Sequence, residues 1–169
     1  MRRSDKQITH RDEIDEILLA GEVCHLALKD EPFPYVIPLN YGYGTLRRPA
    51  ARDPAAGDPA AADQPALLFH GADSGRKIDL MRRDPRAAFV VDVDHRLVTD
   101  EEACRFTMHY RSVMGHGTIV FLDEADAKRY ALNRIMAQYS GRDDWPLSDG
   151  DLARVTIFAL LIEELSGKS

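Results

Sequence analysis

Short apolar runs with the residue types of β-strands recur along this chain, and turns separate most of them. The runs cover residues 23–28, 35–41, 66–70, 87–93, 104–121 and 155–162. Helical patterns are confined to the start of the chain, residues 76–83, and two later segments at about 124–139 and 149–153. Because short connections join most strands, antiparallel pairing should dominate. The sequence therefore predicts a mainly β fold, a closed or partly open β-barrel with peripheral helices, rather than a doubly wound sheet.

The composition fits one reduced, soluble domain. Of the 169 residues, 44% are hydrophobic, which is enough for a single core. The net charge of −6 argues against a general nucleic-acid binder, and no apolar run approaches the ~18 residues of a membrane helix. The basic start lacks the apolar stretch of a secretory signal. Cys24 and Cys104 are expected to be small buried residues, so we expect a cytoplasmic protein without disulfides, nucleic-acid partner or membrane contact.

Residues 47–66 differ in composition from the rest of the chain. They contain eight alanines and four prolines. Proline interrupts both helices and strand ladders, so this segment predicts a mobile surface loop inserted between two strands of a single domain spanning residues 1–169. Drift in loop length without function is the simpler interpretation, and a substrate lid is the alternative.

The segment 69–77, Phe-His-Gly-Ala-Asp-Ser-Gly-Arg-Lys, predicts an anion site. A strand leads through a glycine-containing turn into a helix start, where free backbone N–H groups attract anions. Ser74 can donate a hydrogen bond, Arg76 can grip two phosphate oxygens, and Lys77 adds a point charge. The sequence has no Walker loop. The alternative is an ordinary capped helix with solvated basic residues.

With its flanks, this segment resembles the pyridoxamine 5′-phosphate oxidase-like family of split β-barrels, which bind flavin mononucleotide (FMN) at a homodimer interface. The resemblance rests on Gly75-Arg76-Lys77, on Asp84-Pro85-Arg86 and on the strand at 35–40. Similarity to the Nim-type subgroup, the 5-nitroimidazole-resistance proteins, rests on His70 and on residues 1–6, 36–42, 110–117, 131–136 and 154–156. It covers nearly the whole chain except 47–66, where the family has a short turn.

The resemblance implies a homodimer and a set of cofactor contacts. Arg76 and Lys77 would hold the FMN phosphate, with Ser74 or the turn amides adding hydrogen bonds. Val36, Ile37, Pro38 and Leu39 would present backbone and apolar contacts to the flavin ring, and the missing N–H of Pro38 matters little where the strand faces the flavin. Arg111 and Ser112 would reach the phosphate or ribityl group, in the same or the other subunit. For Tyr110, Arg111 and Ser112, barrel packing with a surface ion pair is the alternative. The full implied set is Val36, Ile37, Pro38, Leu39, Phe69, His70, Gly71, Ser74, Arg76, Lys77, Tyr110, Arg111, Ser112 and Val113.

His70 is the catalytic candidate. In Nim-type proteins the matching histidine lies near the flavin, and imidazole titrates close enough to neutral pH to deliver protons during nitro-group reduction. A strand-end histidine bonded to backbone and a haem axial ligand are the alternatives. We expect no metal site, because His109 and His116 are seven residues apart and would face opposite sides of one strand.

The function expected from the resemblance is an FMN-dependent oxidoreductase that reduces small aromatic or nitroaromatic compounds. The flavin would supply the redox chemistry. An electron donor would come from outside, because the sequence has no dinucleotide-binding fingerprint. A flavin- or haem-binding carrier or sensor without turnover is the alternative, and a dimeric scaffold with a decayed ligand site is the third interpretation.

Overall fold

The computed structural model of the chain describes residues 6–47 and 63–169. Its strands are β1 (Gln7–Ile8), β2 (Cys24–Leu28), β3 (Tyr35–Leu39), β4 (Gly42–Arg47), β5 (Asp63–Gly71), β6 (Arg86–Val98), β7 (Thr107–Leu122) and β8 (Thr156–Lys168). Its helices are α1 (Arg11–Ala20), α2 (Arg76–Arg83), α3 (Ala125–Ser140) and α4 (Asp149–Ala153), with a 3-10 turn at Ala103–Arg105. The prediction of a mainly β, antiparallel fold with peripheral helices is confirmed.

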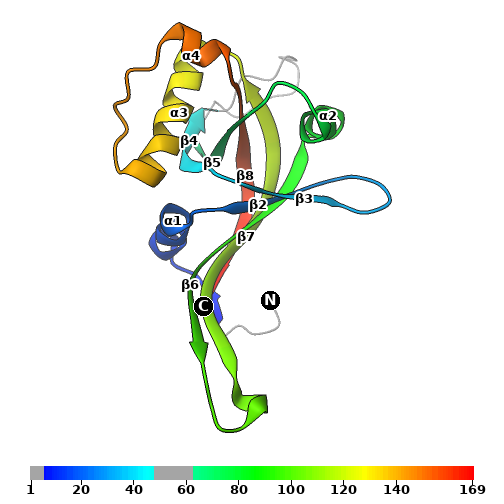
Figure 1. Ribbon diagram of the computed structural model, residues 1–169, viewed down its shortest axis with the longest axis vertical. Coiled ribbons are helices and arrows are strands. Elements are labelled where there is room, and N and C mark those ends of the chain that lie inside the picture. Colours follow the sequence, from blue (N-terminus) through cyan, green and yellow to red (C-terminus); the bar gives the residue numbers. More distant parts are fainter. Residues whose placement is uncertain (1–5, 48–62) are drawn as a thin grey trace.

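The strands form one antiparallel sheet in the order β3-β2-β6-β7-β8-β5-β4, and β1 pairs with β8. Only Asn40 and Tyr41 separate β3 from β4, so the two edges of this sheet are consecutive in the chain and the sheet curls around a core. α3 packs against β4 and β5, and α2 lies beside β2. The paired ends of β6 and β7 project beyond the barrel as an arm, at the opposite end of the molecule from α2 (Figure 1).

Unbroken apolar runs form the strands that are buried on both faces. In β5, Leu67 and Phe69 face the barrel interior, while Ala66 and Leu68 belong to a second core under α3. β8 alternates between the same two cores. Because successive strand residues point to opposite faces, a strand covered on both sides needs apolar residues at every position. Burial on two faces fixes the position of β5, which leads into the predicted anion site.

Three expectations about the organisation of the chain are wrong. The run at 35–41 is not one strand, because β3 ends at Leu39 and an unpredicted strand, β4, follows. β4 extends to Arg47 and β5 begins at Asp63, so both ends of the segment 47–66 are strand; residues 48–62 of the predicted loop lie outside the described residues. Cys24 is buried, which raises the pKa of its thiol to about 12, but Cys104 lies exposed in the 3-10 turn of the arm.

Candidate functional site

The turn between β5 and α2 ends in a helix start without a side-chain cap. Gly75 is the N-cap residue and has φ 110° and ψ 168°, a conformation that glycine adopts far more readily than other residues. Because glycine has no side chain, the N–H groups of the first turn donate no hydrogen bond to a capping side chain at this position. The backbone N–H groups of a helix start carry partial positive charge and attract anions. The turn therefore has the backbone geometry of the predicted phosphate site.

Lys77 reaches from the first turn of α2 back to the end of β5. A Cβ at Gly71 would lie 2.8 Å from Lys77 Nζ, so any larger residue there would displace the ammonium group. Within the described ranges, Lys77 forms no ion pair, and Ser74 is exposed in the same turn. Among the described residues, the Lys77 ammonium group thus has no ion-pair partner, and it lies at the end of β5, one residue beyond the start of α2.

Arg76, in contrast, already has an acidic partner. Its Nε and Nη2 lie 3.0 and 2.5 Å from Oδ2 of Asp30, in the turn between β2 and β3, and its guanidinium lies 5.1 Å from the centre of the Tyr35 ring. The hydrogen bonds from Arg76, followed by the one from the Glu31 N–H, lower the pKa of Asp30. Asp30 is therefore ionised at neutral pH, and these contacts tie the start of α2 to the start of β3.

β3 is the edge strand beside this turn. Val36 and Pro38 are exposed, while Ile37 and Leu39 are half-buried against the barrel core. Pro38 lies opposite His25 of β2, and β2 is the only partner of β3 in the sheet of the described residues. An edge strand tolerates proline because a ladder hydrogen bond need not be lost. The residues predicted to contact the ring and those predicted to hold the phosphate therefore lie on adjacent elements.

The last residues of β5 differ in exposure. His70 lies opposite Ile157 of β8 and is exposed, so a ligand can reach its imidazole. Phe69 has no exposed area and stacks on Phe158 in the barrel, with ring centroids 5.2 Å apart. Of the predicted contacts, Phe69 is thus limited to its backbone, since its side chain is part of the core.

The predicted contacts on β7 do not join the others within one chain. Thr118 of β7 pairs with Arg86, just after α2, and Arg111 lies seven residues earlier in β7, about 23 Å away at the usual strand rise. Arg111 pairs with Asp94 at 2.6 Å and Glu16 at 3.6 Å. Tyr110 is partly exposed, whereas Ser112 and Val113 are buried. Within one chain, the structure therefore brings together only part of the predicted site.

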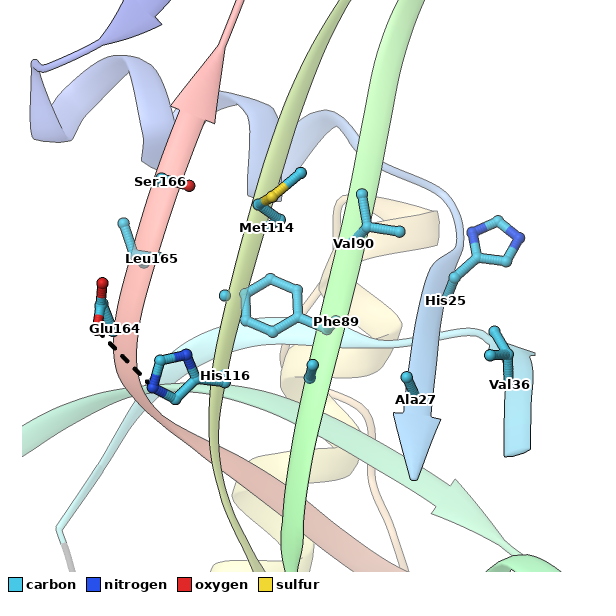
Figure 2. Close-up of a pocket in the computed structure, with 12 residues that line it drawn as sticks. His25, Ala27, Val36, Phe89, Val90, Met114, His116, Glu164, Leu165 and Ser166 are labelled. Carbon is cyan, nitrogen blue, oxygen red and sulfur yellow. Dashed lines mark ion pairs between the residues drawn. The ribbon is translucent and has the colours of Figure 1, made fainter. Parts of the chain in front are cut away.

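A surface hollow lies on the outer face of the sheet, a feature that the sequence reasoning missed. It has a volume of about 510 Å³ and spans β3, β2, β6, β7 and β8 (Figure 2). Two rows of paired residues cross it, in which each residue lies beside its neighbours on the adjacent strands. They are Pro38–His25–Val90–Met114–Ser166 and Val36–Ala27–Ala88–His116–Glu164. We call these ten residues the outer face.

The outer face is largely apolar although it is open to solvent. Val36 is 57% exposed and Met114 48% exposed. The imidazole of His116 lies 3.8 Å from the carboxylate of Glu164 at one side, and His25 lies toward the other (Figure 2). Contiguous exposed apolar surface of this kind marks a binding or interaction site. Phe106, Met108, Tyr110 and Met114 are all exposed and occupy even positions of residues 106–114, and this alternation is the sequence signal that could have pointed to the outer face.

Two further properties concern the described ranges 6–47 and 63–169. No three His, Cys, Asp or Glu side chains gather there as they would around a metal ion. No helix there is long and apolar enough to cross a membrane.

Comparison with known proteins places the chain in a family. Residues 10–169 match the family described as pyridoxamine 5′-phosphate oxidase. No curated protein matches the chain significantly.

Solved structures with a similar fold cover nearly the whole chain. One, from Bacteroides thetaiotaomicron, is described as a candidate 5-nitroimidazole antibiotic resistance protein; it has 26% identity and a TM-score of 0.73, covering 96% of this chain and 85% of that one. A FAD and haem binding protein from Mycobacterium smegmatis has 21% identity and a TM-score of 0.70, covering 96% and 72%. The flavocytochrome Anf3 from Azotobacter vinelandii has 19% identity and a TM-score of 0.71, covering 99% and 71%. The family match extends over most of the sequence, and the chain therefore belongs to the pyridoxamine 5′-phosphate oxidase family.

Proposed function

We propose that this protein binds FMN, with the phosphate at the start of α2 and the ring along β3. The observation that carries the proposal is the glycine-led helix start, which has an unpaired lysine within the described ranges and lies next to an edge strand. Lys77, Ser74 and the turn amides would hold the phosphate, and Arg76 would contribute from the same helix turn. Val36 and Pro38 would present an apolar surface without competing hydrogen-bond donors at Pro38.

The proposal includes a homodimer in which each flavin site is shared. Residues 110–112 lie far along β7 from its pairing with the residue that follows α2, so we assign them to the site of a second copy. The open outer face would pack against the same face of that copy, as an isologous two-fold interface requires. Tyr110 and Arg111 of one copy would then approach the phosphate turn of the other.

We further propose that the protein reduces small aromatic or nitroaromatic compounds. When bound, the flavin would supply the electron transfer. The exposed imidazole of His70, at the end of the strand that enters the phosphate turn, would deliver a proton to the substrate from its ring nitrogen. Support comes from the Bacteroides neighbour, which is described as a nitroimidazole-resistance protein. The electron donor would be a separate molecule.

A carrier or sensor that binds flavin or haem without turnover is the second candidate. It is favoured by two neighbours whose descriptions name haem-containing or flavocytochrome proteins, and by the accessible side chain of His70. A haem ligand at His70 would leave the phosphate turn without a role.

Freshly purified protein is expected to be yellow, with the visible bands of an oxidised flavin. Heat-released cofactor should run as FMN by chromatography, at one molecule per chain, and light scattering should give the mass of a dimer. A Soret band would instead favour haem. Folded, colourless protein that takes up no added FMN would refute the flavin proposal.

Replacing His70 with alanine is expected to lower the rate of nitroimidazole reduction about 100-fold, the contribution of a positioned proton donor. The FMN affinity should change less than about threefold, because the imidazole holds no phosphate. Steady-state turnover and a flavin titration measure the two effects. His10→Ala removes another exposed histidine and should leave both unchanged. Equal turnover in His70→Ala and wild type would eliminate His70 as the proton donor.

A further inference from the structure

Asp30 is an acidic residue that pairs with Arg76 of the proposed phosphate site. Its Oδ2 accepts hydrogen bonds from Nε and Nη2 of Arg76, at 3.0 and 2.5 Å. Its Oδ1 accepts from Nη2 of Arg83 at 3.2 Å and from the backbone N–H of Glu31 at 3.0 Å. Only 9% of its side chain is exposed, since two guanidinium groups cover it. Asp30 thus links the first and last turns of α2 by accepting hydrogen bonds from Arg76 and Arg83.

This contact uses the part of Arg76 that a phosphate would use. The Nε and Nη2 groups form one edge of the guanidinium, and that edge binds carboxylates and phosphates through two parallel hydrogen bonds. In this structure both groups donate to Asp30. Lys77, the next residue, has no acidic partner among the described residues. The two cations therefore differ in their partners. Arg76 is paired with a carboxylate, whereas Lys77 has no acidic partner among the described residues and can bind a phosphate.

We propose that Asp30 competes with the flavin phosphate for Arg76 and thereby sets how strongly this site distinguishes phosphorylated from unphosphorylated flavin. The inference rests on the proposed function. With Asp30 in place, Lys77 and the helix start hold the phosphate, and Arg76 offers its remaining Nη1 group. The fixed carboxylate also repels a doubly charged phosphate across the guanidinium. Removing the charge frees the edge of Arg76 and removes the repulsion.

The test compares FMN with riboflavin, which has the same ring and ribityl chain but no phosphate. In Asp30→Asn, the FMN-to-riboflavin affinity ratio should rise about fivefold at low salt, through tighter FMN binding, and the gain should shrink as salt screens the charges. Riboflavin affinity should stay unchanged. Asparagine keeps an oxygen that can accept the Glu31 N–H, which preserves the turn. Asp30→Glu keeps the charge and should keep the wild-type ratio.

Asp84→Asn is the matched control. Asp84 also pairs with an arginine, Arg86, at 2.6 Å, and its side chain is 15% exposed. It follows α2 at the far end, about 12 Å along the helix axis from Arg76. Its removal changes the net charge equally but should leave the FMN-to-riboflavin ratio at the wild-type value.

The outcomes separate this inference from the proposed function. If wild-type protein binds neither FMN nor riboflavin, the proposed function fails. If the wild type binds FMN and Asp30→Asn leaves the ratio unchanged or lowers it, the competition is refuted, and a lower ratio would mean that Asp30 orients Arg76 for the phosphate instead. A raised ratio in both Asp30→Asn and Asp84→Asn would also refute it, because net charge alone would then explain the gain.

Discussion

Replacing Arg76 and Lys77 together with alanine is expected to weaken FMN binding at least about 100-fold while the fold survives. Hydrogen bonds between charged groups contribute about 1.5–3 kcal/mol each, and every 1.4 kcal/mol is tenfold in affinity. The fold should tolerate the change because Arg76 is exposed and Asp30 keeps its hydrogen bonds from Arg83 and from the Glu31 N–H. Fluorescence quenching of FMN measures the affinity, and thermal unfolding followed by circular dichroism measures the stability.

The matched control for this variant is Arg82→Ala/Arg86→Ala, which removes two exposed cations at the other end of α2. It should retain FMN to within about threefold, because those side chains are a helix length from the phosphate turn. Riboflavin affinity should be similar in both double variants and in the wild type. If the Arg76→Ala/Lys77→Ala variant binds FMN as tightly as the wild type, the phosphate binds at another part of the surface.

The apolar pattern predicted the strands of the barrel better than it predicted their ends. β4 was missed because Gly42 and Gly44 weaken the strand signal. The structure gives the reason for these glycines: a Cβ at Gly42 would lie 2.5 Å from the backbone nitrogen of Ile135, and one at Gly44 would lie 2.6 Å from the Tyr130 hydroxyl. Both contacts come from α3, about 90 residues further along the chain; Arg134, for example, donates a hydrogen bond to the carbonyl of Tyr43, which precedes it by 91 positions. Close approach of a distant helix leaves no local pattern from which to predict a strand.

The same distinction between local and distant signals applies to the candidate site. The turn from His70 to Lys77 is contiguous, so its residue types and order could be interpreted directly. Asp30 precedes Arg76 by 46 positions and reaches it only because the β2–β3 hairpin folds beside α2. The outer face depends on the register of several strand pairs, which the sequence alone did not provide. The direction of each side chain at the end of β5 could not be predicted from the sequence either, and this direction makes His70 accessible and Phe69 buried.

Introducing glutamate at Met114 is expected to convert the proposed dimer to monomer, raising its dissociation constant about a thousandfold. Met114 lies in the outer face between Val90 and Ser166, which offer no cation to a new carboxylate. A two-fold interface buries the substitution twice, and an unpaired buried charge costs several kcal/mol. Analytical ultracentrifugation across a concentration series measures the dissociation constant.

FMN affinity should fall together with dimerisation in Met114→Glu, because residues 110–112 would no longer reach the partner's phosphate turn. Leu19→Glu is the control: Leu19 is similarly exposed, at 50%, but lies on α1, away from the outer face. It should leave both the mass and the FMN affinity unchanged. A Met114→Glu protein that remains dimeric would place the interface elsewhere. A monomer that binds FMN as tightly as wild type would instead show that one chain suffices for the site and that Arg111 only pairs with Asp94.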